Sequence, residues 1–429
     1  MNQMQKEPAR SAVLIGGGIP MTKTASASPA DVLIGSDGRI AAIGDRIDPP
    51  EGCQIIKADG CLILPGFVDA HQHLDKTGVL RFAPNPSGTL QGARDAFALY
   101  ARNAPPEDIL NRASLTIAQC LSQGTTAIRS HVNVDKDAGF NGMEALVQLR
   151  RDWADRVRLQ LVAFMTPHPR QDLDWLRANI DRAVEQGDAV GGTPAVAEDP
   201  DTYLDIIFQA AAQHGRPVDL HMDEHLNASR QLFPKVFERV RRFGMQGRTV
   251  LSHCSVLSAM PRAGFEAVMA EIRDLGIGVI TLPAANLYLQ GRDSDILPPR
   301  GLTRVAELAR AGIPIATASD NIQDPFVPTG SGDMLEIARW TLLAGHLKGD
   351  ELELAYRMIT GIPARLMGLD DHGLRIGARA DLVIARSADI ASLVAGGATE
   401  MQVLAAGRLV SESTRALSLW HVMPDPAPC

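Results

Sequence analysis

The chain has 429 residues, of which 45% are hydrophobic and 21% are charged, and its formal net charge is −8. This composition is sufficient for a large core and excludes wholesale disorder, and the acidic balance is opposite to the basic footprint of nucleic-acid binding. No apolar stretch approaches the roughly 18 residues that cross a bilayer. We therefore expect neither nucleic acid nor a membrane as a partner.

The first residues and the cysteines both indicate a cytoplasmic protein. The start of the chain has one short apolar run, at residues 13–15, and no extended apolar region of the kind found in secretory signals. Five cysteines are scattered without CxxC spacing, which is typical of reduced thiols: Cys53, Cys61, Cys120, Cys254 and Cys429. We further expect a homo-oligomer that acts on a small molecule.

The two ends of the chain share a β-rich texture. Residues 11–64 are dense in short apolar runs and turns, with a Ser-Asp-Gly hairpin signal at residues 36–38. Residues 373–411 repeat this texture. We predict that residues 1–64 and 370–429 form one small β-sandwich domain.

The segment between them alternates short apolar runs with amphipathic patterns. The expected strands are Leu62–Asp69, Thr125–Val134, Arg158–Met165, Ala189–Ala195, Pro217–Glu224, Thr249–Val256, Gly278–Ala284 and Pro314–Asn321. Helical patterns separate them at residues 106–124, 143–157, 172–187, 201–215, 265–276 and 302–312. This alternation predicts parallel βαβ units of the α/β class. We expect a (β/α)8 TIM-type barrel over residues 65–369, with a doubly wound open sheet as the alternative.

Side chains that can bind a metal follow several of these strands. His71 and His73 are two residues apart, so an extended chain aims both imidazoles the same way. His221 ends the fifth strand and Asp320 the eighth. In a barrel, the carboxyl ends of the strands converge on one mouth. Three imidazoles and one carboxylate suit Zn²⁺, Fe²⁺ or Mn²⁺, so the pattern predicts a metal-dependent hydrolase.

Three further residues are candidates near this mouth. His253 lies towards the end of the sixth strand, where it is either a fifth ligand or a donor beside the metal. Glu224 lies three residues past His221, where a loop can bring its carboxyl group over the metal to move a proton. His131 ends the second strand and is expected either to line the pocket or to lie behind the ligands.

Matching segments run along nearly the whole chain and resemble the amidohydrolase superfamily, in particular its cytosine deaminase branch. The quoted motifs are LPGFVDAHQHLDKT, GTTAIRSHVNVD, DLHMDEH, LSHCS, NLYLQGR, ASDNIQDPFVPTGSGDM and GLRIGARADLVI. Binuclear relatives bridge two metals with a lysine from a middle strand. Here no lysine occurs between Lys136 and Lys235, so we expect one divalent ion, Zn or Fe(II).

The resemblance implies His71, His73, His221 and Asp320 as metal ligands. It also implies Glu224 as a proton shuttle, His253 as a partner to the attacking nucleophile, and Asp320 as the acceptor of a proton from that nucleophile. The implied reaction is hydrolytic deamination, in which water adds to a ring carbon bearing an exocyclic amine and ammonia leaves. The expected substrate is an amino-substituted N-heterocycle such as cytosine or a related pyrimidine or pterin.

Three departures bear on the substrate. Cytosine enzymes of this branch carry Gln, a second Asp and Trp where this chain has Thr166, Asn321 and Phe326, which we take as substrate-binding residues. An ionised Asp only accepts hydrogen bonds, whereas Asn also donates. With Asn at position 321, the chain resembles relatives that act on s-triazine amines. An alternative function is therefore hydrolysis of a cyclic amide or an N-alkylamino-triazine at the same metal, and a catalytically silent scaffold protein is a third.

Overall fold

The computed structural model describes residues 11–21, 28–167 and 173–418. The other parts of the predicted terminal domain (residues 1–10, 22–27 and 419–429, with Cys429) lie outside the described residues. So does residue 172, with which one predicted helix begins.

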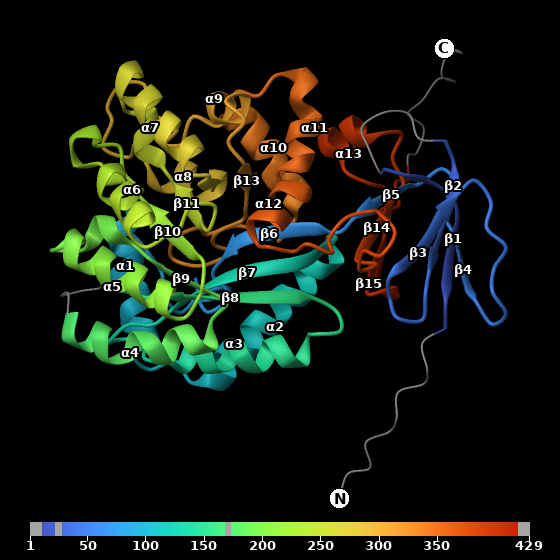
Figure 1. The fold of residues 1–429 in the computed structure, drawn as a ribbon, viewed down its shortest axis with the longest axis horizontal. Coiled ribbons are helices and arrows are strands. Elements are labelled where there is room, and N and C mark those ends of the chain that lie inside the picture. Colours follow the sequence, from blue (N-terminus) through green and yellow to red (C-terminus); the bar gives the residue numbers. More distant parts are fainter. Residues whose placement is uncertain (1–10, 22–27, 168–172, 419–429) are drawn as a thin grey trace, which may run out of the picture.

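Eight parallel strands form the central sheet, and each pairs with the next along the chain (Figure 1). They are β6 (Phe67–Gln72), β7 (Thr125–Asn133), β8 (Arg158–Phe164), β9 (Ala189–Gly192), β10 (Val218–Met222), β11 (Thr249–His253), β12 (Gly278–Thr281) and β13 (Ile315–Thr317). A parallel bridge between Gln72 and Asp320 joins the last strand back to the first. The predicted (β/α)8 barrel is confirmed, and the open-sheet alternative is wrong.

Most helices of the described residues lie around the barrel (Figure 1). The helices are α1 (Leu90–Ala101), α2 (Pro106–Ser122), α3 (Asn141–Asp152), α4 (Leu173–Gln186), α5 (Pro200–Gln213), α6 (Phe233–Arg242), α7 (Arg262–Asp274), α8 (Pro283–Leu289), α9 (Val305–Arg310), α10 (Met334–Ala344), α11 (Leu352–Arg357), α12 (Gly361–Leu366) and α13 (Ile390–Gly396). Short 3-10 turns are η1 (Pro194–Val196), η2 (Ala228–Arg230), η3 (Ser255–Ser258) and η4 (Gly349–Glu351).

The helix α2 illustrates why these segments are helical. Pro106 stands at its first position, where its missing N–H costs no hydrogen bond. Glu107 and Asp108 follow in the first turn, where acidic side chains complement the helix dipole. The apolar side chains at Ile109 and Ile117 are buried, so the helix packs this face on the barrel.

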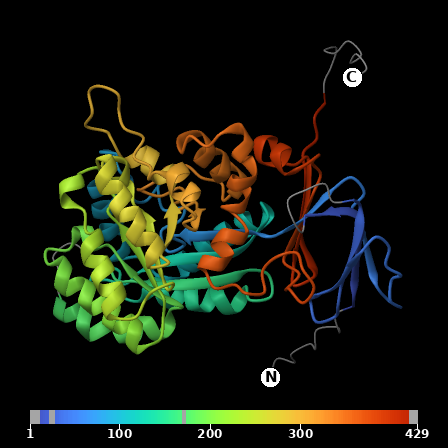
Figure 2. The same cartoon turned by 45° about the horizontal axis from the view of Figure 1, so that its top comes forward.

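The two chain ends form a second sheet beside the barrel, seen at the right of Figure 1 and from another direction in Figure 2. Its strands are β1 (Val13–Pro20), β2 (Ala30–Ile34), β3 (Ile40–Gly44), β4 (Gln54–Lys57), β5 (Leu62–Pro65), β14 (Leu382–Ala385), β15 (Glu400–Ala405) and β16 (Arg408–Thr414). The first half of β1 pairs with β2 and β4, and its end pairs with β5. Gly17, at φ 73°, lies where the register shifts between these halves. Side chains from the N-terminal and C-terminal parts of the chain share one hydrophobic core in this sheet.

One expected strand is in fact two. The apolar run Leu62–Asp69 divides into β5, which belongs to the terminal sheet, and β6, which opens the barrel. The chain passes between the sheets at Gly66, where a Cβ would meet the Thr126 side chain at 2.1 Å. Hydrophobic periodicity cannot reveal such a change of sheet, because both strands are fully buried.

Several expected strands also extend too far at their carboxyl ends. Strand β13 ends at Thr317, and β10 at Met222. Asp320 therefore belongs to the loop beyond its strand and not to the strand end. The structure thus places Glu224 and Asp320 in loops beyond their strands, whereas His71 and His221 lie within strands.

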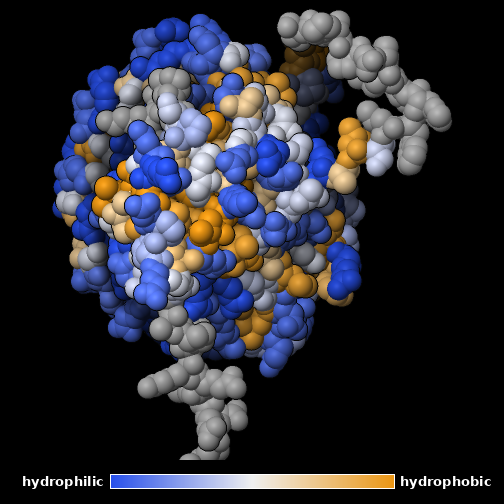
Figure 3. Space-filling model, turned by 90° about the vertical axis from the view of Figure 1, so that its right-hand side faces the viewer, coloured by the Kyte–Doolittle hydropathy of each residue, from blue (hydrophilic) through white to orange (hydrophobic). Residues whose placement is uncertain are grey.

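No helix among the described residues is long and apolar enough to cross a membrane. The surface seen from the side of the terminal sheet has an apolar area among hydrophilic residues (Figure 3).

Candidate active site

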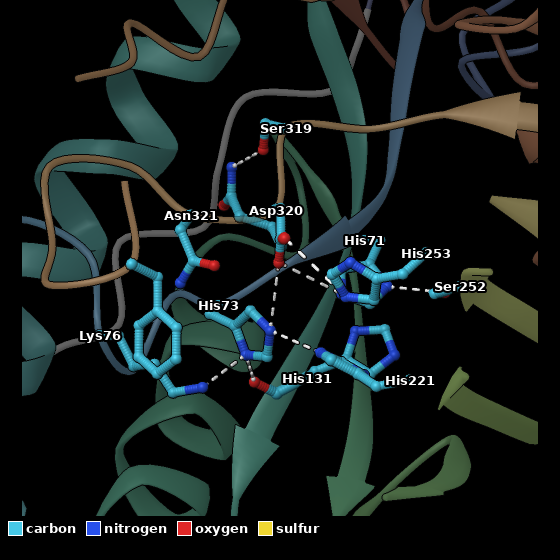
Figure 4. Close-up of polar contacts among 12 residues, drawn as sticks. His71, His73, Lys76, His131, His221, Ser252, His253, Ser319, Asp320 and Asn321 are labelled. Carbon is cyan, nitrogen blue, oxygen red and sulfur yellow. Dashed lines mark hydrogen bonds and ion pairs between the residues drawn. The ribbon is translucent and has the colours of Figure 1, made fainter. Parts of the chain in front are cut away.

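Polar side chains from several strands converge at the carboxyl mouth of the barrel (Figure 4). His71 lies in β6 and His73 directly after it, His221 lies in β10, and Asp320 follows β13. The structure therefore brings together the four residues that the sequence singled out as ligands. All four side chains are buried.

These four residues offer one compact set of donor atoms. Each contributes one ligand atom, and all of these atoms lie within 4.8 Å of one another. Nε2 of His71 and Nε2 of His73 are each 3.4 Å from Oδ1 of Asp320. Nε2 of His73 is 3.0 Å from Nε2 of His221. Nitrogen and oxygen atoms at these separations can share one metal ion.

Buried polar atoms of this group lack hydrogen-bond partners within the part of the chain that the structure describes, which supports the binding of a metal ion. Among the described residues, Nε2 of His71 and Oδ1 of Asp320 have no hydrogen-bond partner, although both are buried. Buried polar atoms without partners are rare and need an explanation. A bound cation would satisfy both, so the residues present fit a metal ion.

The pKa values of the candidate ligands are shifted in the direction that favours metal binding. Burial lowers the pKa of His73 and of His221 well below the ordinary value, so both imidazoles are neutral. Burial opposes ionisation of Asp320, but the neighbouring imidazoles of His253 and His71 hold the pKa of this carboxyl well below its usual range. Neutral imidazoles and a carboxylate are the protonation states in which these groups bind metals.

A hydrogen-bonded chain orients His71. Its Nδ1 lies 2.9 Å from Oγ of Ser252. The Ser252 hydroxyl in turn donates to Oδ1 of Asp219 at 3.4 Å, and Arg129 donates to the other Asp219 oxygen at 2.8 Å. With Nδ1–H donating to Ser252, Nε2 keeps its lone pair for a metal.

His73 is held in the same tautomer by a different partner. Its Nδ1 lies 2.9 Å from the carbonyl oxygen of His131 and 3.0 Å from Nζ of Lys76. An Nδ1–H that donates to the carbonyl cannot also accept from an ammonium group. Lys76 is therefore free to donate into the pocket, where its Nζ lies 5.1 Å from the ring centroid of Phe326.

His131 lies behind the four residues. Its ring stacks on that of His71 at 3.8 Å, and its Nε2 is 3.2 Å from Oδ1 of Asp219. Burial lowers its pKa to about 4. Of the two possibilities left open by the sequence, the structure favours a place behind the ligands, because His131 does not line the pocket.

Glu224 and His253 face each other beside the metal-binding group. Oε1 of Glu224 is 3.5 Å from Nδ1 of His253, and Nε2 of His253 is 3.9 Å from Oδ2 of Asp320. Burial, followed by the charge of Asp320, raises the pKa of Glu224 to about 8. Burial lowers the pKa of His253 to about 3. The pair therefore combines a protonated carboxyl group with a neutral imidazole near pH 7.

Two of these residues have unusual backbone conformations. His253 has φ 65° and Asp320 has φ 63°, in the left-handed region that side chains other than Gly rarely adopt. Backbone strain of this kind concentrates at functional sites, where the surrounding structure maintains it. Here it turns both side chains into the mouth.

The three residues expected to contact a substrate all line the same pocket, together with His73, His221, Glu224, His253 and Asp320. Thr166 donates to Oδ2 of Asp135 at 2.9 Å. Nδ2 of Asn321 donates to Oδ2 of Asp324 at 2.6 Å. The aromatic ring of Phe326 forms part of the wall.

Two cationic side chains of the pocket were missed by the sequence analysis. Lys76 follows the HxH motif, and this Asp-Lys pair is visible in the sequence. Arg94 lies on α1, which was not among the expected helices. The apolar spacing around it, from Leu90 to Ala101, was the signal that could have revealed this helix.

Buried imidazoles and a carboxylate lie beside a pocket at the carboxyl mouth of an eight-stranded barrel. This combination of fold and site is typical of metal-dependent hydrolases. The chain belongs to the amidohydrolase family, whose sequence model matches residues 86–410.

Similar proteins cover nearly all of the chain. A pterin deaminase of Rhizobium rhizogenes is 31% identical over 390 residues, which are 90% of this chain and 88% of the relative. The structure of a 5-methylcytosine deaminase from Klebsiella pneumoniae liganded with 5-fluorocytosine has a TM-score of 0.86 at 28% identity, covering 96% of this chain and 99% of the other. That of an N-isopropylammelide isopropylaminohydrolase from Burkholderia multivorans has a TM-score of 0.81 at 29% identity, covering 95% and 100%. The predicted cytosine deaminase-like membership is thus confirmed.

Proposed function

We propose that this protein is a metal-dependent aminohydrolase that releases ammonia from an amino-substituted N-heterocycle, such as cytosine or a related pyrimidine or pterin. One observation carries the proposal. Buried donors of His71, His73, His221 and Asp320 lie within 4.8 Å of one another, at the end of a pocket that also holds the carboxyl group of Glu224.

We propose that these four residues hold a single divalent ion, Zn or Fe(II). When bound, such an ion lowers the pKa of water toward neutrality and so supplies a nucleophile. Strand β9, the fourth of the barrel, reads Ala-Val-Gly-Gly and has no side chain that could bridge to a second ion. Asp219, a further carboxylate behind His71, is already paired with Arg129.

The remaining residues have distinct roles in this proposal. Oδ2 of Asp320 accepts a proton from the attacking water, and the neutral imidazole of His253 orients it. The protonated carboxyl of Glu224 gives a proton to the ring nitrogen next to the reacting carbon. A carbon–oxygen bond forms and the exocyclic carbon–nitrogen bond breaks. The proton held by Asp320 passes to the amine, which leaves as ammonia, and the proton of the new hydroxyl group returns to Glu224 as the ring carbonyl forms.

Thr166, Asn321 and Phe326 are proposed to read the substrate. The ring of Phe326 packs against the heterocycle, and Asn321 and Thr166 present polar groups to its edge. Because Asn321 both donates and accepts, it suits an edge with a different hydrogen-bond pattern from that of cytosine.

A second candidate is hydrolysis of an N-alkylamino-triazine or a cyclic amide at the same ion. It is supported by the N-isopropylammelide isopropylaminohydrolase at 29% identity and by Asn321. The two candidates share their ligands and differ in the leaving group, which is an alkylamine or a ring nitrogen in place of ammonia.

We also propose a cytoplasmic homo-oligomer without nucleic-acid or membrane partners. The net charge of −8 and four free cysteines among the described residues support this environment. Exposed apolar side chains on α10, Trp340 (41% exposed) and Leu343 (72%), support an interface between copies. Light scattering of the purified protein measures the number of subunits.

An ammonia-release screen tests the proposal. Protein loaded with Zn or Fe(II) is assayed with cytosine, isocytosine, pterin, creatinine, guanine and ammelide, and bound metal is measured in the same samples. We expect one metal per chain and ammonia from at least one heterocycle. An alkylamine or a ring-opened acid without ammonia would favour the second candidate. Absence of both bound metal and product would refute both.

A further inference from the structure

One face of α1 forms a wall of the pocket. Five of its residues line the pocket, and they are spaced at three and four positions, which places them on one side of a helix: Leu90, Arg94, Phe97, Ala98 and Ala101. Arg94 is therefore a single charged side chain on an otherwise apolar pocket wall.

The guanidinium of Arg94, a side chain that is partly exposed, lacks the protein partners that the buried Arg129 and Arg112 have. Among the described residues, no hydrogen bond or ion pair within 4.0 Å involves it, and the charges of Glu224 and Asp95 act on it electrostatically. By contrast, Arg129 contacts both Asp219 and Gln160, and Arg112 contacts Asp108 and backbone carbonyls. Those two arginines are satisfied within the fold, and Arg94 is not.

The guanidinium of Arg94 is partly exposed to the pocket, so its N–H groups remain available to a ligand. It has five N–H donors and stays charged, so it can bind an anionic group that enters the pocket. The pocket side chains around it on α1 are apolar and offer no acceptor. A ligand that enters the pocket can supply the acceptors that the protein does not.

We propose that the natural substrate is an anionic heterocycle, in which a carboxylate on a ring position other than the reacting carbon binds Arg94. Two parallel N–H···O bonds match the planar fork of the guanidinium to a carboxylate. This inference rests on the proposed function, because it identifies the class of heterocyclic amine that the same pocket takes.

Matched substrate pairs test this inference. Cytosine and 5-carboxycytosine form one pair, and pterin and 6-carboxypterin form the other. For each pair, kcat/KM for ammonia release and Kd by calorimetry are measured on the metal-loaded wild type, Arg94→Met and Arg94→Lys. The matched control is Arg262→Met, which removes an exposed arginine outside the pocket.

We expect the wild type to prefer the carboxylated member of at least one pair. Arg94→Met should reduce binding of that member about 10- to 100-fold more than binding of its uncharged partner, as expected for the loss of a charge-assisted pair. Arg94→Lys should recover part of the difference, and Arg262→Met should match the wild type.

The outcomes separate this inference from the proposed function. Tighter binding of a carboxylated member that depends on Arg94, without ammonia release, keeps the inference and removes the deaminase proposal. Ammonia release with equal losses for both members of each pair in Arg94→Met keeps the deaminase and refutes the inference. Failure of both carboxylated compounds to bind the wild type also refutes it.

Discussion

Oε1 of Glu224 lies 3.5 Å from Nδ1 of His253, and both side chains are buried at the end of the pocket. Nδ1 of His253 also lies 3.1 Å from Nδ2 of Asn286. An imidazole nitrogen that accepts from Asn286 cannot donate to a carboxylate as well. The lone pair of Nδ1 would repel an ionised carboxylate at this distance, which favours the protonated form of Glu224 and agrees with its raised pKa.

Glu224→Gln should lower turnover by at least about 10²-fold, because the variant loses a general acid–base group. We expect the metal content to stay at the wild-type level, since Glu224 is not among the four grouped donors. Steady-state kinetics and metal analysis of the same preparation measure both effects. Glu266→Gln, an exposed pair with Arg262, is the control. Unchanged turnover would remove Glu224 from the mechanism.

The pH profile should report the same group. The pKa of Glu224 is raised to about 8, so the protonated fraction falls as pH rises through that value. A divalent ion on Asp320 offsets part of the negative charge that contributes to the shift. We therefore expect kcat/KM to decline on the alkaline side at or below about pH 8, and this limb should be missing in Glu224→Gln. A limb of the same pKa in both proteins would assign it to another group.

His71→Ala should abolish stoichiometric metal binding and activity together, because it removes one of four donors. Metal analysis after dialysis against the chosen ion gives the result directly. His214→Ala, which changes a histidine paired with Asp181 on the surface, should keep one ion per chain. One tightly held ion and normal turnover in His71→Ala would show that His71 is not a ligand.

Ser252→Ala should weaken metal binding about 10- to 100-fold without removing any ligand. The hydroxyl group holds Nδ1 of His71 at 2.9 Å, and loss of such an orienting partner typically has this effect. Competition with a chromogenic chelator measures the affinity. Ser258→Ala, at an exposed hydroxyl nearby in the sequence, is the control. Equal affinities in all three proteins would contradict the orienting role.

Asn321→Asp should destabilise the fold by about 2–4 kcal/mol, because it replaces a buried hydrogen bond with two facing carboxyl groups. Nδ2 of Asn321 is now 2.6 Å from Oδ2 of Asp324. Adding Asp324→Asn should restore most of the loss by exchanging the donor and the acceptor. Denaturant unfolding measures the free energy in each variant. The surface change Asn227→Asp should stay within about 0.5 kcal/mol of wild type, and a fully stable Asn321→Asp would disprove the coupling.

The sequence alone was enough to predict the barrel and the meeting of the four candidate ligands. Apolar runs that alternate with amphipathic helices define parallel βαβ units, and polar residues at the same end of such strands must share one mouth. Local periodicity is a property of consecutive residues, so it can be read without the fold. For the same reason it missed the change of sheet at Gly66, which depends on the distant side chain of Thr126.

Only the tertiary structure decided which side chains of the pocket contact one another. The Asn321–Asp324 pair, the chain from His71 through Ser252 to Asp219, and the solitary guanidinium of Arg94 all depend on which side chains meet across the mouth. Residue spacing specifies the direction of a side chain along its own strand or helix. Whether a partner stands opposite depends on the closure of the barrel and on the loops above it, which bring residues about 250 positions apart into hydrogen-bond contact.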